Sequence, residues 1–277
     1  MAENALGGFL RARREATAPS EVGFPDGPRR RTPGLRRSEL AELAGISVEY
    51  LTRLERGRDR HPSSQVLGAL ADALGLTPDE RVHLYRLVKV GSGAMCQQAA
   101  ARPELRPTVR ALLDRLESTP AFVMDAGDDL LAWTDGFRLL AEPTGLLDGD
   151  RPNLARFVFE DPKARTVFPD WERLADERAA ALRAAADLGD EVAAALADEL
   201  SITVGNEFGR RYTAAAALPA WTGVQRWTHP EAGTLTLAYE SLLLPGTDEE
   251  QRLVAYLPAD EAAAGALDKI LYSRLTH

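Results

Sequence analysis

A pair of short helical patterns that meet at one glycine constrains the fold of this chain most. The first pattern runs over about residues 37–44, and Gly45 follows it directly. Glycine readily adopts the left-handed conformation that ends a helix, and Ser47 is a residue type that begins one. Both patterns turn apolar side chains to one side, namely Leu40, Ala41, Leu43, Ala44, Leu51 and Leu54, with Ile46 at the corner. The sequence therefore predicts a helix-turn-helix.

Further helices are expected around this pair. Three further segments, which start near Leu6, Ser63 and Thr77, have apolar residues at helical spacing, and the third begins with a capping box. A broken, basic stretch over residues 20–34 indicates an exposed loop. Residues 1–90 are therefore predicted to form an all-α head of five helices.

Charge divides the chain unevenly. Residues 1–90 carry 15 basic and 12 acidic side chains, whereas the remainder carries 18 and 30, within a formal net charge of -9. Nine arginines and five acidic residues fall within residues 29–60. Such a focused positive field attracts polyanions even when the total charge is negative.

The segment RRSELAELAGISVEYLTRLERGRDRHPSSQVLGALADAL resembles the DNA-binding domain of the phage-repressor type, the broad XRE-like group. The resemblance implies that the helix after Gly45 lies in the major groove, with its first turns against base edges and flanking groups on phosphates. It assigns base reading to Val48, Glu49, Tyr50 and Arg53. It assigns phosphate contacts to Arg36, Arg37, Ser47, Thr52, Arg56 and Arg58. Arg53 is suited to guanine, Glu49 to a cytosine amino group and Val48 to a thymine methyl.

The alternative for each of these residues is an exposed helix position or a surface ion pair, such as that of Glu55 with Arg58. For the helix as a unit, binding to double-stranded DNA is the favoured interpretation. Repressors of this docking type read paired half-sites, so a homodimer is expected.

Composition limits the rest of the chain. With 277 residues, 45% of them hydrophobic, about two domains are expected. Cys96 is the only cysteine, so one chain builds neither an intramolecular disulfide nor a multi-cysteine metal cluster. The sequence has no apolar run long enough for a membrane span and no apolar secretory signal. We therefore expect a cytoplasmic protein without membrane contact.

Residues 91–107 are predicted to be a linker and residues 108–277 a second domain, with a helix resuming from Arg110 to Glu117. Alternating apolar runs predict two strands around Gly127 and three more in TGVQRWTH, TLTLAYESLLL and QRLVAYLP. Helical patterns lie between these groups and after them. This order indicates an α+β domain with an antiparallel sheet, in which a cavity commonly lies between sheet and helices.

The segments LLAWTDGFRLL, NLARFVFEDPKARTVFPDWERLADERAAALRAAA and HPEAGTLTLAYESLLLPG resemble the MmyB-like ligand-binding domain, a PAS-like fold found behind the same kind of head in actinobacterial regulators. The resemblance implies a transcription regulator that senses an apolar small molecule, such as a fatty acid. Its pocket wall is expected at Val123, Leu131, Trp133, Phe137, Leu140, Phe157, Phe168, Trp171, Leu182 and Phe208. Ordinary core packing is the alternative for each of them.

A carboxylate in an apolar cavity needs a cation. Helical spacing places Arg178 within the apolar stripe of WERLADERAAALRAAADL, whereas the resemblance favours Arg183. Either guanidinium is suited to charge-assisted hydrogen bonds, and we take Arg183 first and Arg178 second. An arginine that lies along the rim with its charge in water is the alternative for both.

Other function classes lack support in the sequence. It has no nucleophile elbow, zinc-protease, P-loop or dinucleotide motif, and the four histidines, His61, His83, His229 and His277, are scattered. An enzyme, a haem, a flavin or a bound metal is therefore not expected, and His229 is interpreted as a residue at a strand end. A body that acts only as an acidic protein-interaction or dimerisation module is the alternative to a small-molecule sensor.

Overall fold

The computed structural model describes residues 5–24, 34–59, 61–92, 105–215, 220–245 and 250–272. The chain divides into two compact units. The first holds Met1–Ala100 together with Asp198–Arg210, and the second holds Ala101–Ala197 together with Arg211–His277. The first unit thus includes a segment that the sequence-based boundaries place in the second domain. Within the described ranges, no helix combines the length and the apolarity needed to cross a membrane.

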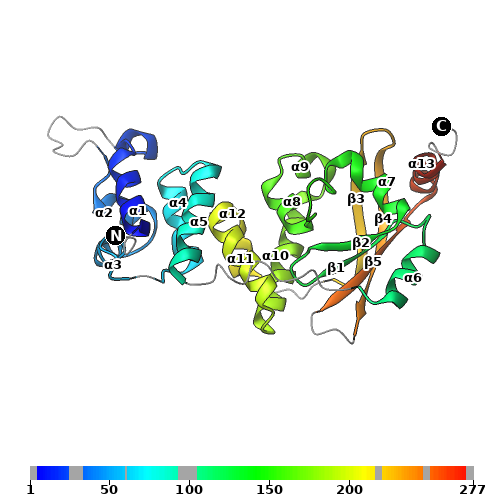
Figure 1. Ribbon diagram of the computed structural model, residues 1–277. Helices are drawn as coiled ribbons and strands as arrows, with labels where there is room; N and C mark the ends of the chain where they lie inside the picture. Colours follow the sequence, from blue (N-terminus) through cyan, green and yellow to red (C-terminus); the bar gives the residue numbers. More distant parts are fainter. Residues whose placement is uncertain are drawn as a thin grey trace. The chain divides into compact units, whose positions relative to one another are not determined.

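Helices build the first unit (Figure 1). They are α1 (Ala5–Ala16), the 3-10 turn η1 (Pro19–Val22), α2 (Arg37–Leu43), α3 (Val48–Glu55), α4 (Ser64–Ala73) and α5 (Pro78–Ser92). Leu10, Leu51 and Leu84, from three of these helices, are fully buried in one core. The predicted helical head is confirmed. The turn η1 corrects the prediction of a plain loop after residue 20, because the Glu21 carboxylate accepts the N–H of Ala18 at 3.2 Å; residues 25–33 of that loop lie outside the described residues.

The connection between α2 and α3 has the predicted chemistry. Gly45 has a φ of 65°, in the left-handed region. The Ser47 hydroxyl accepts the backbone N–H of Tyr50 at 3.1 Å, which caps α3. Leu43 corrects a prediction, since it is 40% exposed. A helix turns by about 100° per residue, and Leu43 lies outside the arc occupied by the buried residues Leu40, Ala41 and Ala44.

Five antiparallel strands form the sheet of the second unit. They are β1 (Ala121–Asp125), β2 (Leu130–Trp133), β3 (Thr222–His229), β4 (Gly233–Leu244) and β5 (Gln251–Pro258), in the order β2-β1-β5-β4-β3. Each predicted strand is present. The prediction of an α+β domain with an antiparallel sheet is confirmed.

Helices pack on both faces of this sheet (Figure 1). The inner face carries the main core, to which α7 (Asp135–Ala141), α8 (Leu154–Glu160), α9 (Ala164–Val167), α10 (Trp171–Asp187) and α13 (Glu261–Tyr272) contribute; η3 (Glu142–Thr144) follows α7. Trp227 of β3, only 1% exposed, belongs to this core. On the outer face, α6 (Pro107–Arg115) packs on Val123 and Leu253. Alternate residues of a strand point to opposite faces, so β1 and β5 supply residues to both cores.

The start of α6 corrects the predicted linker. Pro107, placed in the linker, is the first helical residue, three residues before the expected start at Arg110. Proline suits this position because the first N–H of a helix has no partner within the helix and the fixed φ of proline is already helical. The remaining helices are α11 (Glu191–Thr203) and α12 (Asn206–Ala214), and the boundary between the two units crosses α11.

Candidate functional site

Helix α3 presents a polar side to solvent. Val48, Glu49 and Arg53 are exposed, whereas Leu51 and Leu54 are buried. Of the other predicted contacts, Tyr50 and Thr52 are half-buried. The helical turn of about 100° per residue groups Val48, Glu49, Thr52 and Arg53 within one arc, with Tyr50 at its edge. The four side chains predicted to read bases therefore lie on, or beside, one exposed strip.

The contacts of Arg53 hold its guanidinium beside this strip. The guanidinium carbon lies 5.2 Å from the centroid of the Tyr50 ring, and Nη2 lies 3.8 Å from the Asp59 carboxylate. Contacts of this kind are weak at exposed positions. The side chain of Arg53 keeps 54% of its surface exposed. These contacts therefore orient the Arg53 guanidinium and leave more than half of the side chain accessible to solvent.

Glu55, the last residue of α3, is buried between two arginines. Its Oε1 accepts Arg14 Nε at 2.5 Å and its Oε2 accepts Arg37 Nε at 2.7 Å. The surface pairing of Glu55 with Arg58 is therefore wrong, because Glu55 points into the unit. Arg37, predicted to contact phosphate, is also engaged with Glu55. We call Arg14, Arg37 and Glu55 the head triad.

The other predicted phosphate contacts lie around α3. Arg36, Ser47, Arg56 and Arg58 are exposed. The backbone N–H of Arg36 donates to the Glu39 carboxylate at 2.7 Å, so Glu39 supplies the cap that an arginine side chain does not provide for α2. The exposed guanidinium groups of Arg36, Arg56 and Arg58 are therefore accessible to phosphate oxygens beside the strip.

In the second unit, α10 carries an arginine into the interior. The predicted stripe of α10 is buried, namely Trp171, Leu174, Ala175, Leu182 and Ala185. Arg178 on this stripe is only 9% exposed. Its Nη1 lies 3.4 Å from Asp128 Oδ1, which is long for a hydrogen-bonded ion pair. Among the described residues, neither Arg178 Nε nor Asp128 Oδ2 has a hydrogen-bond partner.

Two sheet residues extend this polar region. The Tyr256 hydroxyl donates to Gln225 Oε1 at 2.6 Å, and the amide nitrogen of Gln225 finds no partner in the part of the chain that is described. Burial raises the pKa of Tyr256, and the positive charge of Arg178 opposes that rise. A buried donor without a partner is unfavourable unless a bound molecule satisfies it. We call Asp128, Arg178, Gln225 and Tyr256 the interior polar cluster.

Sequence reasoning found only Arg178 of this cluster. Gln225 alternates with Trp227 along TGVQRWTH, so the same period of two that predicted the strand also places Gln225 on the inner face. A polar residue at such a position was an available signal. Asp128 gave no comparable signal, because aspartate is common in turns and is usually exposed there.

The turn between β1 and β2 concentrates carboxylates. Asp125 Oδ1 accepts the N–H groups of Gly127 and Asp129, each at 2.9 Å. Asp128 has a φ of 63°, a conformation that few residues other than glycine adopt. Burial raises the pKa of Asp128, against the opposing charge of Arg178. Burial, followed by the charge of Asp129, raises the pKa of Asp125 to about 7.

This turn predicts a stability that falls as the pH rises. The pKa of Asp125 is about 7 in the folded chain against an ordinary 3.8, so the folded state binds the proton more tightly than the unfolded state. The contribution of the Asp125 proton to the free energy of unfolding is full below about pH 4 and is lost as the pH rises through 7. Each unit by which the pKa is raised corresponds to about 1.4 kcal/mol. Asp125→Asn keeps the accepting oxygen and should be more stable than the parent above pH 7, by a few kcal/mol.

Urea unfolding midpoints between pH 4 and pH 8 at constant salt measure this difference. Asp114→Asn, an exposed change on α6, is the control and should follow the parent at every pH. Parallel pH profiles for the parent and Asp125→Asn would contradict the assignment.

Arg183 lies on the opposite side of α10 from the interior polar cluster. Its Nε donates to Asp187 at 2.9 Å, and its guanidinium carbon lies 5.4 Å from the centroid of the Tyr212 ring. Its side chain is 40% exposed. Both charged partners of this pair reach water, as in an ordinary i, i+4 surface pair. Of the two arginines considered for a ligand carboxylate, Arg178 is the one inside the domain.

The predicted pocket wall is divided by the sheet. Trp133, Phe137, Leu140, Phe157, Phe168 and Trp171 belong to the inner core. Val123 and Leu131 pack instead with α6 on the outer face, so they do not line one cavity with the others. Apolarity alone misled here, because every residue of β1 is buried and its two faces look alike in sequence. Leu182 is buried in α10, and Phe208 is buried in the segment that belongs to the first unit.

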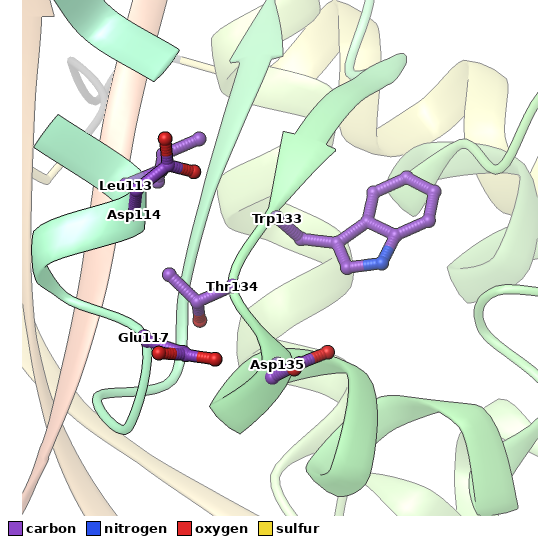
Figure 2. A pocket seen from close by; sticks show the side chains of 6 residues that line it. All are labelled: Leu113, Asp114, Glu117, Trp133, Thr134 and Asp135. Atoms are coloured by element: carbon purple, nitrogen blue, oxygen red, sulfur yellow. The ribbon is translucent and has the colours of Figure 1, made fainter. Parts of the chain in front are cut away.

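A surface pocket of about 390 Å³ lies beside Trp133 (Figure 2). Its lining is Leu113, Asp114, Glu117, Trp133, Thr134 and Asp135. Three carboxylates, those of Asp114, Glu117 and Asp135, therefore belong to the lining (Figure 2), and their charge repels an anionic ligand. This pocket does not suit the carboxylate of a fatty acid.

Metal-ligating groups do not gather in the described parts of the chain. No set of three or more His, Cys, Asp or Glu side chains there is arranged to hold a metal ion. His229 ends β3, is buried, and accepts the N–H groups of Glu231 and Ala232 on Nδ1, each at 3.2 Å. This bonding agrees with the strand-end role predicted for it. Cys96 lies outside the described residues.

Comparisons with known proteins agree with this geometry. Residues 105–270 match the MmyB-like transcription regulator ligand binding domain, and residues 5–84 match a helix-turn-helix domain. Among solved structures, the chain is similar to an RNA-binding light-oxygen-voltage receptor at 12% identity and a TM-score of 0.28, over 97% of this chain and 67% of that one. The comparison with curated proteins gives no significant match.

The match to the ligand-binding domain spans more than half of the chain, and a helix-turn-helix with an exposed polar strip precedes it. The chain therefore belongs to the MmyB-like transcription regulators, with a DNA-binding head and a ligand-binding body.

Proposed function

We propose that this regulator binds its operator through α3 as a homodimer and responds to a long-chain carboxylic acid, such as a fatty acid, anchored by Arg178. The single observation that carries the ligand proposal is a buried guanidinium whose Nε is free of partners within the described residues. The inner core borders the cluster, since the Trp227 ring lies 5.7 Å from that of Tyr256. An aliphatic chain suits this apolar surrounding.

The interior polar cluster offers donors that suit a carboxylate. Arg178 Nε and the amide nitrogen of Gln225 are both N–H donors, and a carboxylate accepts several such bonds. One buried cation does not compensate two buried anions, so the ligand competes with Asp128 for Arg178. The raised pKa of Asp128 favours the protonated form that makes this exchange possible.

Native mass spectrometry of the gently purified full chain tests the ligand class. We expect an adduct with the mass of a long-chain acid, or binding of added dodecanoate with a stoichiometry of about one per chain. A chain that carries no acid and takes up no dodecanoate in calorimetry would contradict the proposal.

The strip on α3 predicts two different effects on DNA binding. Arg53→Ala should reduce discrimination between bases by about 1–3 kcal/mol, because a bidentate contact to guanine is lost. Arg56→Ala should weaken binding to every sequence and lower the salt slope by about 1, because one phosphate contact is lost. Fluorescence anisotropy with a duplex selected from a random library, and with a scrambled duplex, measures both at several salt concentrations. Binding like the parent in both variants would refute the assignment of α3 to the groove.

A second candidate function rests on the outer face of the sheet. Val224 and Leu257 flank Ala238 on neighbouring strands, and they are 49% and 56% exposed. Exposed apolar residues in contact mark interaction surfaces more often than scattered ones do. The body would then be a dimerisation or protein-interaction module without a small-molecule ligand. Loss of dimers in Leu257→Asp by analytical ultracentrifugation, together with no acid bound by the parent, would favour this candidate.

A further inference from the structure

We propose that α11 is a coupling lever, which links the carboxylate turn beside Arg178 to the core of the DNA-binding unit. The ligand side of this coupling rests on the function proposed above. Residues 198–210, comprising the end of α11 and the start of α12, are called the docking segment.

The docking segment completes the core of the first unit. Ile202 is 1% exposed and belongs to the same core as Leu67 and Leu70 of α4. Gly68 lies between those two leucines in sequence, and a Cβ there would come within 2.0 Å of the Ser201 carbonyl oxygen. Only glycine fits at such an approach of two backbones. Helix α4 and the docking segment are therefore in direct backbone contact.

Hydrogen bonds also hold the docking segment against α4 and α5. Asp72 Oδ2 accepts the N–H of Asn206, the first residue of α12, at 2.6 Å, while Asp72 Oδ1 accepts Arg81 Nη2 at 2.6 Å. Arg81 Nη1 also donates to the Ile202 carbonyl at 3.3 Å. A Cβ at Gly205, whose φ is 74°, would come within 2.1 Å of Asp72. These bonds satisfy backbone groups at the end of α11 and the start of α12, which would otherwise be unpaired.

The other end of α11 contacts the carboxylate turn in the second unit. A Cβ at Gly127 would come within 2.8 Å of Val192 Cγ1, near the start of the helix. Gly127 precedes Asp128, and Asp128 faces Arg178 at 3.4 Å. Two contacts, joined by the peptide bond between Gly127 and Asp128, thus lead from the proposed ligand anchor to α11.

One continuous helix joins the two ends. Helix α11 runs for 13 residues from Glu191 to Thr203, and helix shifts of about 1–2 Å are common in switching proteins. A ligand carboxylate that takes Arg178 from Asp128 removes the nearest opposite charge from a residue held at positive φ. The turn then rearranges against Val192, and α11 transmits the movement to α4 and α5. Occupancy of the body changes the affinity of the head for DNA by this route.

Gly68→Ala tests the lever in the full chain. Alanine adds only a Cβ and favours the helix by about 1 kcal/mol, so α4 itself should persist while the Ser201 carbonyl is displaced. Gly8→Ala in α1 is the matched control, because nothing lies within 4 Å of a Cβ at that position. Hydrogen exchange measured by mass spectrometry should show residues 198–210 exchanging about tenfold faster in Gly68→Ala than in the parent or in Gly8→Ala.

Binding to the selected duplex gives the functional result. Dodecanoate should change the Kd of the parent and of Gly8→Ala by about 5- to 150-fold, the usual range of allosteric coupling. In Gly68→Ala this change should disappear, while calorimetry finds dodecanoate bound as in the parent. Parental exchange of residues 198–210 in Gly68→Ala overturns the proposal, and so does a retained response to dodecanoate after the segment has been released.

Asp128→Asn separates the lever from the identity of the ligand. Asparagine tolerates the positive φ and removes the charge that faces Arg178, so it disturbs the turn without any ligand. It should change the Kd for the duplex in the parent background but not together with Gly68→Ala. If the parent binds no dodecanoate, the proposed function fails while this comparison still decides the coupling. Equal effects of Asp128→Asn in both backgrounds overturn the lever.

Discussion

Replacing Glu55 by glutamine is expected to destabilise the first unit by about 3–5 kcal/mol, because it leaves buried positive charge without its counter-ion. Glu55 is 5% exposed and binds Arg14 and Arg37, and Arg14 is itself only 4% exposed. Arg14 also donates to the Leu35 carbonyl at 2.8 Å, which carries no charge, and its contact with the half-exposed Glu15 carboxylate is long, at 3.4 Å. A small helical unit has little stability to spare against a loss of this size.

The two units can be followed separately in this experiment. All four tryptophans, Trp133, Trp171, Trp221 and Trp227, belong to the second unit, so their fluorescence reports on the body alone. In Glu55→Gln, urea should unfold part of the helical circular-dichroism signal at a lower concentration than in the parent. The main tryptophan transition should stay near its parental midpoint. Glu42→Gln, an exposed change on α2, is the control, and an equal shift in both variants would sink the idea of a buried triad.

The head triad also bears on DNA binding. Glu55 ends the helix that carries the proposed base-reading strip, and its two arginines come from α1 and the first residue of α2. Fixing the end of α3 to two neighbouring helices sets the direction in which Arg53 points. Partial loss of operator affinity in Glu55→Gln at low temperature, where the unit remains folded, is expected from this geometry.

Arg178→Gln is expected to weaken dodecanoate binding by about 10- to 100-fold, the effect of losing charge-assisted hydrogen bonds worth about 1.5–3 kcal/mol. The affinity for dodecanol, which has no carboxylate, should change little. Isothermal titration calorimetry of the full chain measures both ligands. Because Arg178→Gln leaves Asp128 buried without its cation, the variant Arg178→Gln with Asp128→Asn removes the pair together and separates affinity from folding.

Arg183→Gln provides the matched control on the same helix. Arg183 pairs with Asp187 at the surface, so its loss should leave dodecanoate affinity within about twofold of the parent, as for surface ion pairs in general. The reverse result, with loss of affinity in Arg183→Gln alone, would transfer the anchor to Arg183. Equal binding of dodecanoate by all variants would remove both arginines from the site.

Much of the fold was predictable because its signals are local. The glycine at position 45, the serine cap at position 47 and the period of the apolar residues act within a few residues, and the structure has the expected elements there. Errors arose where two environments give the same local signal. Val123 and Leu131 are as apolar as the inner core residues, but they pack beneath α6. Leu43 is equally apolar and lies outside the buried arc of its helix.

The candidate sites were predictable only in part. Arg178 followed from its place in the stripe of α10, but the family resemblance favoured Arg183, which was therefore taken first. The partners Asp128, Gln225 and Tyr256 come from segments separated by at least 31 residues along the chain. The docking segment lies 121 residues from its partner in the Arg81 to Ile202 bond. No periodic pattern spans such separations.

The sequence by itself determined the order of helices and strands, the helix-turn-helix and the placement of an arginine on the buried side of α10. Backbone geometry and the burial of apolar side chains dictate these features within windows of a few residues. Only the tertiary structure decided that Glu55 joins Arg14 and Arg37, that the sheet divides the predicted pocket wall and that residues 198–210 complete the first unit. Such pairings depend on how whole faces fit together, and a close approach such as that of Gly68 to Ser201 exists only after the chain has folded.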